Sequence, residues 1–335
     1  MNIKGIGIPM KRLFICLYFI SFNLILFLLI APFVIFYGPF ESLKLFTIGT
    51  ILTSRHPQVA EFLLSQEEIA KLIQSYNESI ITVEPVILGK EHIIIDRENG
   101  LKIENISGKY FRGKVMLINN PHQITLAVTK ELGIAGQRLT DLVAESKAIA
   151  GINAGGFYDP NAQGNGAYPD GITVQEGLVI HNNIGNEAAN IIGFDQNGKL
   201  VLSSMTVHEI SKQKIQNAVT FYPNLLLEGK PQIKGDGGWG LAPRTGIGQR
   251  PDGTVILVVI DGRQPGWSMG ATLRDLMNIF IEYGAENAAN LDGGSSSEMV
   301  YKGQILNKLW NIYGERYIPT AFVILPQSSL AGNSY

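Results

Sequence analysis

The chain has 335 residues, of which 45% are hydrophobic and 17% charged, with a formal net charge of −2. This length suits one large domain plus an appended segment. Near-neutral charge without a Lys/Arg-rich run argues against a nucleic-acid partner, which requires a basic face. The single cysteine, Cys16, excludes an internal disulfide, and a zinc site elsewhere in the chain would lack thiolate ligands.

The N-terminal segment is predicted to anchor the chain in a membrane. Residues 13–37 are almost wholly apolar and uncharged, longer than the ~20 residues that cross a bilayer. Lys4, Lys11 and Arg12 precede them, so the positive-inside bias predicts a cytoplasmic N-terminus and an extracytoplasmic remainder. A cleaved signal peptide is the alternative, but its apolar core normally has only ~7–15 residues. We therefore predict a cytoplasmic tip and anchor over 1–40 of a single-pass cell-membrane protein.

A spacer is predicted over residues 41–100. Apolar residues recur at helical spacing over 58–76, which predicts an amphipathic helix. That helix suits a stalk, a helix packed on the domain, or a dimerising helix, so homo-oligomerisation stays open. Residues 92–96 form a short β-like run, and 104–114 are polar and loop-like.

A compact domain is predicted over residues 101–326, followed by a tail over 327–335. Paired apolar runs joined by turn residues predict three hairpins. These pair 114–118 with 123–129, 171–174 with 178–181, and 191–194 with 199–202. Helices are predicted over 138–148, with Thr140 as a candidate N-cap, and over 207–216. Because strands dominate and few helices intervene, the fold class is predicted as α+β with a mixed sheet.

The most informative stretch runs from residue 244 to residue 301. An apolar run over 255–260 ends in Asp261-Gly-Arg263, a helical segment follows over 271–283, and a second apolar run ends in Asp292-Gly-Gly. Such runs are typical of strands buried on both faces, and an Asp at the end of a strand lies at the sheet edge, where ligand crevices occur. With Arg244, these residues offer two carboxylates and two guanidinium groups to one pocket.

Three motifs in order carry a family resemblance. They are Ile-Asn-Ala-Gly-Gly-Phe at 152–157, Pro-Arg-Thr-Gly-Ile-Gly at 243–248, and Asp-Gly-Arg at 261–263 continuing to Leu-Asp-Gly-Gly at 291–294. Together they resemble the phosphodiester glycosidase family over about residues 100–326. That family includes a lysosomal enzyme that removes N-acetylglucosamine from a phosphodiester, and bacterial envelope proteins often labelled exopolysaccharide-related. The resemblance implies an α+β domain that hydrolyses a sugar-1-phosphodiester.

The resemblance also implies a set of site residues. The family's characteristic positions correspond to Asn153, Arg244, Asp261, Arg263 and Asp292. The chain departs from the family twice, because Ser295 stands where a third Gly is frequent and Glu298 where a small hydroxyl residue is frequent. The full predicted set is catalytic Asp261, Asp292, Arg244 and Arg263, with substrate-binding Asn153, Gly155, Gly156, Phe157, Thr245, Gly293, Gly294, Ser295 and Ser296.

The chemistry of a sugar-1-phosphodiester suggests a role for each group. A carboxylate, Asp261 or Asp292, would face the anomeric carbon as nucleophile or base. Arg244 and Arg263 would hold the phosphate through their bidentate forks. Two purely structural interpretations are the alternatives to these catalytic roles. The Asp-Gly pairs would only form turns, and Arg263 and Asp292 would form a structural salt bridge. No cofactor is required, although Ca²⁺ or Mg²⁺ between the two carboxylates stays open.

Three functions compete at this point. The first is a membrane-anchored hydrolase acting on a glycan or sugar-phosphate substrate of the cell envelope. The second is a non-catalytic polysaccharide-binding or assembly module that uses the same crevice. The third is a structural envelope protein in which the Asp and Arg side chains only brace the fold. Two buried acids with two guanidinium groups favour the hydrolase.

Overall fold

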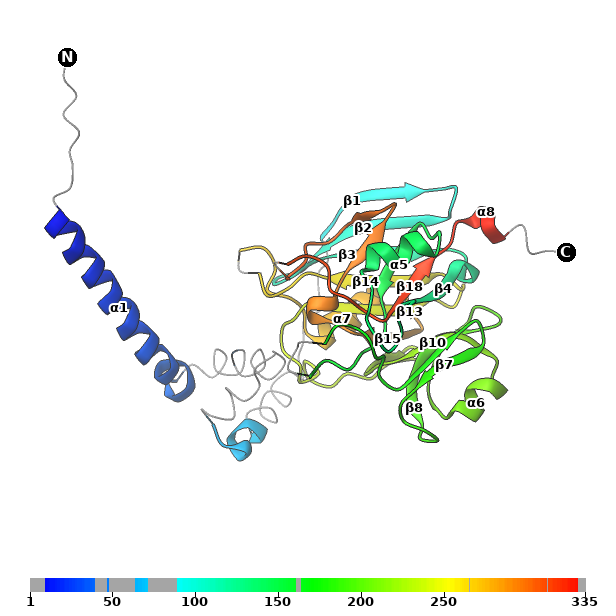
Figure 1. The fold of residues 1–335 in the computed structure, drawn as a ribbon, viewed down its shortest axis with the longest axis horizontal. Coiled ribbons are helices and arrows are strands. Elements are labelled where there is room, and N and C mark those ends of the chain that lie inside the picture. Colours follow the sequence, from blue (N-terminus) through cyan, green and yellow to red (C-terminus); the bar gives the residue numbers. More distant parts are fainter. Residues whose placement is uncertain are drawn as a thin grey trace, which may run out of the picture. The chain divides into compact units, whose positions relative to one another are not determined.

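The computed structural model describes residues 10–39, 47, 64–71, 89–160, 164–264, 266–311 and 313–330. They belong to two compact units, within residues 1–74 and 75–335 (Figure 1). The domain limits predicted from the sequence stay predictions.

The first unit contains a long apolar helix, α1, over Met10–Tyr37. Its segment Phe14–Tyr37 reaches a mean hydropathy of 2.6, and most of its side chains are exposed. An exposed apolar helix of this length is suited to lipid rather than water. The predicted N-terminal apolar helix is therefore confirmed, and by length and composition it is either a membrane anchor or a signal sequence. Pro32 lies inside it.

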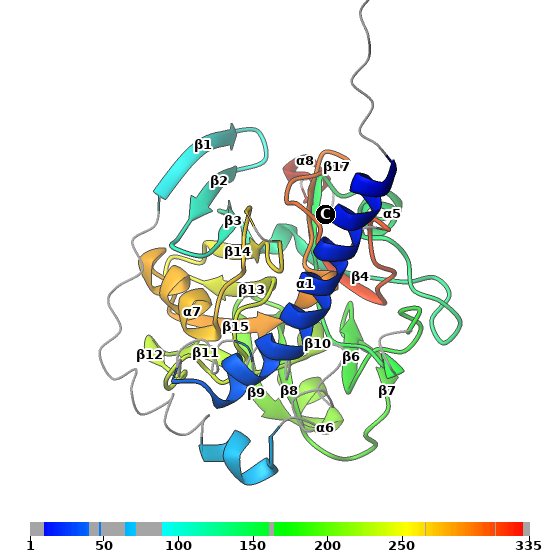
Figure 2. The same ribbon diagram turned by 90° about the vertical axis from the view of Figure 1, so that its left-hand side faces the viewer.

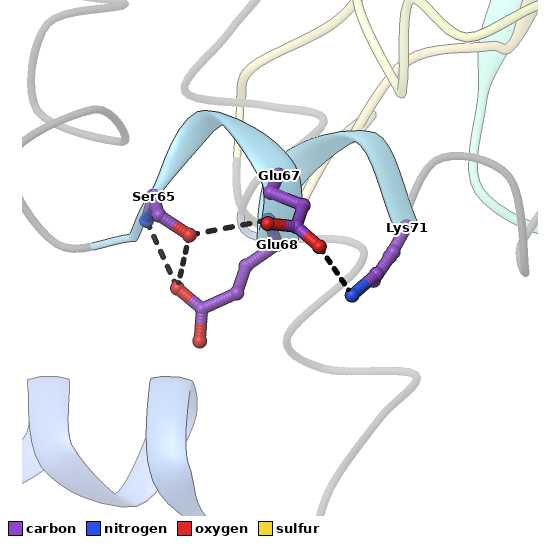
Figure 3. Close-up of polar contacts among 4 residues, drawn as sticks. All are labelled: Ser65, Glu67, Glu68 and Lys71. Carbon is purple, nitrogen blue, oxygen red and sulfur yellow. Dashed lines mark hydrogen bonds and ion pairs between the residues drawn. The ribbon is translucent and has the colours of Figure 1, made fainter.

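A short helical segment of the first unit, residues 66–71, has a defined start (Figure 3). The Glu68 carboxylate accepts hydrogen bonds from the Ser65 backbone N–H at 2.9 Å and hydroxyl at 2.8 Å, while Ser65 Oγ accepts from the Glu68 N–H at 3.3 Å. This reciprocal pair is a capping box. Lys71 and Glu67 add an exposed i,i+4 ion pair at 2.6 Å. The other residues of the helix predicted over 58–76 lie outside the described ranges.

The second unit is built from three antiparallel sheets. The eight-stranded sheet has the order β1(Gly89–Asp96), β2(Leu101–Ser107), β3(Arg112–Ile118), β14(Val255–Ile260), β13(Arg244–Gln249), β15(Asn287–Leu291), β11(Asn224–Leu227), β12(Lys230–Pro231), and Figure 2 shows most of this row of strands. The second sheet has the order β7(Leu178–Asn182), β6(Ile172–Gln175), β10(Ile215–Thr220), β8(Ala189–Asp195), β9(Leu200–Met205). The third has the order β17(Gln304–Ile305), β16(Met299–Tyr301), β5(Ala150–Asn153), β18(Thr320–Ile324), β4(Ile124–Val128).

Few helices accompany these sheets in the described part of the second unit, which confirms the α+β prediction, although the strands there pair antiparallel and not in the expected mixed sheet. They are α5(Leu139–Glu145), α6(Val207–Lys212), α7(Leu273–Glu282) and α8(Gln327–Leu330), with short 3₁₀ turns η1(Pro121–Gln123) and η3(Gly294–Ser296). Strands of all three sheets contribute to the main core. Smaller apolar clusters lie under α7, α5 and α6.

Helix α7 explains the glycines of the 243–248 motif. A capping box between Thr272 and Asp275 starts the helix, and its buried apolar residues, including Phe280, pack on the eight-stranded sheet (Figure 2). A Cβ at Gly246 or Gly248 would lie only 2.8 or 2.7 Å from the Phe280 ring. The lack of a side chain at these two glycines therefore leaves room for an aromatic side chain of the core, and not for a ligand.

Several local predictions are wrong. Strand β3 does not form a hairpin with β4, because β3 pairs with β2 and β14 while β4 pairs with β18 in another sheet. The polar stretch 104–114 is largely strand, because its first residues complete β2 and its last residues begin β3, and these two strands pair with each other. Thr140 lies inside α5 and does not cap it. Helix α6 ends at Lys212, and β10 begins where the helix was predicted to continue.

Candidate functional site

The ends of three neighbouring strands gather the predicted residues at one edge of the eight-stranded sheet. Strand β13 lies between β14 and β15. In the register, Asp261 directly follows the residue that pairs with Arg244, and Asp292 directly follows the residue that pairs with Thr245. The two carboxyl groups therefore leave the sheet at the same edge, on either side of β13.

The strand pleat sends these side chains in two directions. Side chains alternate between the faces of a strand. Val259 and Leu291 lie in the main core, so Asp261 continues the core face, whereas Asp292 turns to the opposite face. Arg244 pairs with a residue of the α7 cluster and shares that opposite face. The alternation therefore groups Asp292 with Arg244 and separates Asp261 from both.

Asn153 fixes the backbone on which Asp292 stands. Its side-chain N–H donates to the Asp292 carbonyl at 2.6 Å, and the Asp292 N–H donates to the Ala154 carbonyl at 3.0 Å. The Asn153 carbonyl oxygen accepts from the Thr245 hydroxyl at 2.8 Å and from the Glu298 N–H at 3.1 Å. Asn153 and Thr245 are both buried. This geometry gives them a positioning role behind Asp292.

The Asp292 carboxyl has an unusual protonation equilibrium. Burial raises its pKa to about 6, opposed by a hydrogen bond from Ser296 and by the positive charge of Arg316. A carboxyl with this pKa changes charge near neutral pH, which is the range that acid–base or nucleophilic catalysis uses. As a whole residue, Asp292 is partly exposed.

Arg244 is a buried cation held by backbone carbonyls. Its Nε donates to the Ala271 carbonyl at 3.0 Å, and its Nη2 donates to the carbonyls of Trp239 at 3.1 Å and Gly240 at 2.8 Å. Burial, reinforced by the charge of Arg263, lowers the pKa of Arg244 to about 9. Within the described residues no carboxylate forms an ion pair with Arg244. A bound anion would complete its charge balance.

Arg263 reaches the glycine turn that follows Asp292. Its backbone has a φ of 57°, a left-handed conformation that redirects the chain after β14. Its guanidinium lies over the Trp310 ring at 5.2 Å, and its Nη1 would lie 3.5 Å from a Cβ at Gly294. Gly294 itself has a φ of 62°, and its N–H donates to the Pro243 carbonyl at 3.0 Å. The absence of a side chain at Gly294 thus leaves the space beside Arg263 open.

Arg316 is a third arginine at this turn, and the sequence analysis did not find it. It donates from Nη1 to Ser295 Oγ at 3.0 Å, pairs through Nη2 with Asp159 at 2.6 Å, and lies over the Phe157 ring at 5.0 Å. The positive charge of Arg316 also lowers the pKa of Asp292. Arg316 lies outside the three motifs, just before β18, so the sequence pattern around it did not indicate a site residue.

The other predicted binding residues serve mainly as close-packed backbone. A Cβ at Gly155 would lie 2.8 Å from Val219, and one at Gly156 would lie 3.0 Å from the Phe221 ring. Phe157 is only 8% exposed and supports Arg316. A Cβ at Gly293 would lie 2.9 Å from the Pro243 carbonyl oxygen. These residues shape the floor of the site.

Asp261 lies in a cavity of about 900 Å³ whose lining does not include Arg244, Arg263 or Asp292. Its carboxylate accepts hydrogen bonds from Trp267 Nε1 at 2.7 Å, from the Lys308 N–H at 3.0 Å and from Asn307 Nδ2 at 3.3 Å. Burial raises the pKa of Asp261. The structure thus does not bring together all four residues that were predicted to converge.

Glu298 is a buried acid that lies next to the partly exposed Glu315. It is 3% exposed, and its Oε1 has no hydrogen-bond partner among the described residues. Burial and the neighbouring Glu315 raise the pKa of Glu298 to about 9. Glu315 in turn accepts from the Thr140 N–H at 2.9 Å and hydroxyl at 2.8 Å at the start of α5. Glu298 therefore faces the interior and is protonated at neutral pH.

No group of three or more His, Cys, Asp or Glu side chains is placed to hold a metal ion in the described ranges. Dependence on a divalent cation stays a prediction from the sequence.

The fold and this edge define a class: an α+β protein with one titratable carboxyl and three arginines around a Gly-Gly-Ser-Ser turn. A model of the phosphodiester glycosidase family matches residues 146–325, more than half of the chain. The protein belongs to the phosphodiester glycosidase family.

One curated protein is similar to this chain in sequence. The chain is 26% identical over 185 residues to the SPbeta prophage-derived uncharacterized protein YomE of Bacillus subtilis strain 168, a match that covers 52% of this chain and 27% of that protein. The chain thus spans about a quarter of that relative's length.

Solved structures share the fold at low sequence identity. The catalytic domain of zebrafish N-acetylglucosamine-1-phosphodiester alpha-N-acetylglucosaminidase, auto-inhibited by its pro-peptide, matches with a TM-score of 0.55 and 18% identity over 73% of this chain and 85% of that chain. A hypothetical protein from Synechocystis matches with a TM-score of 0.52 and 17% identity, over 72% and 64%. A putative exported protein from Burkholderia pseudomallei matches with a TM-score of 0.51 and 17% identity, over 64% and 74%.

Proposed function

We propose that this protein is a membrane-anchored, extracytoplasmic hydrolase that cleaves a sugar-1-phosphodiester linkage in cell-envelope or exopolysaccharide glycans. The observation that carries the proposal is the grouping of Asp292 with Arg244, Arg263 and Arg316 around the turn 293–296. Such a group offers a carboxylate to an anomeric carbon and guanidinium groups to a phosphate. The zebrafish relative is named for hydrolysis at an N-acetylglucosamine-1-phosphodiester.

In this proposal the ionised Asp292 acts at the anomeric carbon as nucleophile or base. The bond from that carbon to the phosphate oxygen breaks, and water supplies the new hydroxyl of the sugar. The arginines hold the negative charge of the departing phosphate monoester, so a strong second acid is not required. Asn153 and Thr245 hold the Asp292 backbone in position. Asp261 takes no part at the anomeric carbon, because it opens into a different cavity.

The proposal predicts which bond the full chain cleaves. We expect the protein in non-ionic detergent to convert a methyl phosphodiester of N-acetylglucosamine 1-phosphate into equal amounts of free sugar and methyl phosphate. In water enriched with heavy oxygen, the label should enter the sugar, as detected by mass spectrometry. Label in the phosphate, with release of sugar 1-phosphate, would identify a phosphodiesterase and contradict the proposal. Binding of envelope glycans without turnover of any sugar-1-phosphodiester would favour the polysaccharide-binding alternative.

Arg316 provides a sharper test of how the phosphate is held. We expect Arg316→Lys to lower kcat/KM about 10- to 100-fold, since a charge-assisted hydrogen bond contributes roughly 1.5–3 kcal/mol and lysine lacks the bidentate fork. The measurement is steady-state hydrolysis together with the thermal unfolding midpoint.

The matched control is Arg138→Lys, because Arg138 is exposed and contacts the neighbouring Tyr317 ring at 5.7 Å. Its kcat/KM should stay within about twofold of the unaltered chain, as surface substitutions usually have small effects. Equal rates for the Arg316 and Arg138 variants would remove Arg316 from the site.

A further inference from the structure

The cavity that contains Asp261 has no role in the hydrolysis described above, yet it has the features of a binding site. Its volume of about 900 Å³ lies in the range of small-molecule sites, roughly 300–1,000 Å³. Strands β2 and β3 with their connecting loop form one wall, and residues 266–269 and 306–308 form the other. The β2–β3 wall lies outside residues 146–325, which match the family model.

Four cationic side chains line this cavity against one carboxyl group. They are Lys109, Arg112, Lys114 and Lys308, with Asp261 as the carboxyl. Asp261 already accepts three hydrogen bonds from the protein, and Lys114 donates to Asn105. Even without Lys109, three cationic side chains face the single carboxyl group among the described lining residues.

Two of these cations converge on a single aromatic ring. The Arg112 guanidinium lies 4.5 Å and the Lys308 ammonium 5.2 Å from the centre of the Trp267 ring, which is itself fixed by its hydrogen bond to Asp261. In the part of the chain that the structure describes, neither cationic group donates a hydrogen bond to the protein or pairs with a carboxylate. Both groups line the same cavity, and an anion bound there would accept hydrogen bonds from their open N–H groups.

The rest of the lining suits a sugar ring. Tyr110 and Trp267 are 51% and 40% exposed, and amphipathic aromatic rings of this kind present an apolar face beside polar groups. Polar residues such as Ser107 and Asn307 lie among them. We propose that this cavity is a second binding site, which takes an anionic saccharide whose phosphate or carboxylate group bridges Arg112 and Lys308. The proposal does not depend on the catalytic role of Asp292.

The test is calorimetric titration of the full chain in non-ionic detergent with four probes that contain no phosphodiester. They are trigalacturonate, glucose 6-phosphate, inorganic phosphate and the neutral maltotriose. We expect at least one anionic saccharide to bind, to weaken with added salt, and to bind more tightly than inorganic phosphate, while maltotriose does not bind. If trigalacturonate binds more tightly, the anionic group that the site recognises is a carboxylate. If glucose 6-phosphate binds more tightly, that group is a phosphate.

Variants locate the site. Arg112→Ala and Lys308→Ala should each raise the dissociation constant about 10-fold or more, as expected for loss of a charged hydrogen bond. Lys212→Ala removes an exposed lysine of α6, outside the cavity lining, and should leave binding unchanged. Binding that is absent, equally strong for maltotriose, no tighter than for inorganic phosphate, or insensitive to both cavity variants would overturn the proposal. Unfolding midpoints close to that of the unaltered chain show that the variants are folded.

Discussion

Replacing Asp292 by Asn is expected to lower kcat for a sugar-1-phosphodiester by about 10³-fold, within the range of 10²–10⁴ typical for loss of one acid–base group. Asn keeps the shape of the side chain but can neither attack the anomeric carbon nor take a proton. The fold should survive, because hydrogen bonds with Asn153 and Ala154 hold the Asp292 backbone. Steady-state kinetics and an unfolding curve for the same preparation check both parts.

The pH profile tests the protonation state in which Asp292 acts. Its pKa is raised to about 6, so the carboxylate fraction rises through pH 6 and is nearly complete at pH 8. Because the proposal uses the ionised form, kcat/KM should rise with pH through about 6 and then level. Arg316 stabilises the carboxylate, so Arg316→Lys should leave this limb nearly in place, whereas Arg316→Ala should move it to higher pH.

The control for Asp292→Asn is Asp141→Asn, an exposed carboxylate in the first turn of α5. This variant should retain the full kcat, and its kcat/KM should rise over the same pH range as that of the unaltered chain. An Asp292→Asn variant that keeps a rate within about threefold of the unaltered chain would end the assignment of Asp292 to the reaction. A limb that falls above pH 6 would instead give Asp292 the role of general acid.

Much of the fold could be predicted from the sequence where the local pattern and the tertiary contacts agree. The uninterrupted apolar run of β14 is buried on both faces, and α7 forms within the helical segment predicted over 271–283. The failed hairpin between β3 and β4 shows the limit. Its turn residues were correctly placed in a turn, but the chain changes sheet there, and only long-range pairing with β14 and β18 decides this.

The candidate site was predictable in its residues and less so in its geometry. Asp261 and Asp292 do follow buried strands of one sheet, as their apolar runs indicated, with β13 lying between these two strands. Their divergence depends on the register with β13, because one position in the pleat decides which face a side chain takes. Arg316 could not be found because its role arises from contacts with Asp159 and Ser295, both distant in sequence.

Glu298 was singled out because it departs from the family pattern, and it predicts a pH dependence of stability. Its pKa is raised to about 9 in the folded protein, above the usual value of 4.5, by burial and by Glu315. Between these two values the folded state keeps a proton that the unfolded state has lost. The free energy of unfolding should therefore fall as pH rises from about 5 to 9 and level above that, with a total contribution on the order of several kcal/mol.

Glu298→Gln should remove most of this dependence and make the protein more stable than the unaltered chain at pH 8. The amide is neutral at every pH and can donate to Glu315 as the protonated acid does. The measurement is urea unfolding at pH 5, 7 and 9, followed by the fluorescence of Trp239, Trp267 and Trp310, which all lie in the second unit. Glu187→Gln, at an exposed position, should keep the slope of the unaltered chain. An unchanged slope in Glu298→Gln would mean that Glu298 is ionised inside the fold, and its unpartnered Oε1 would then require a cation in the folded protein.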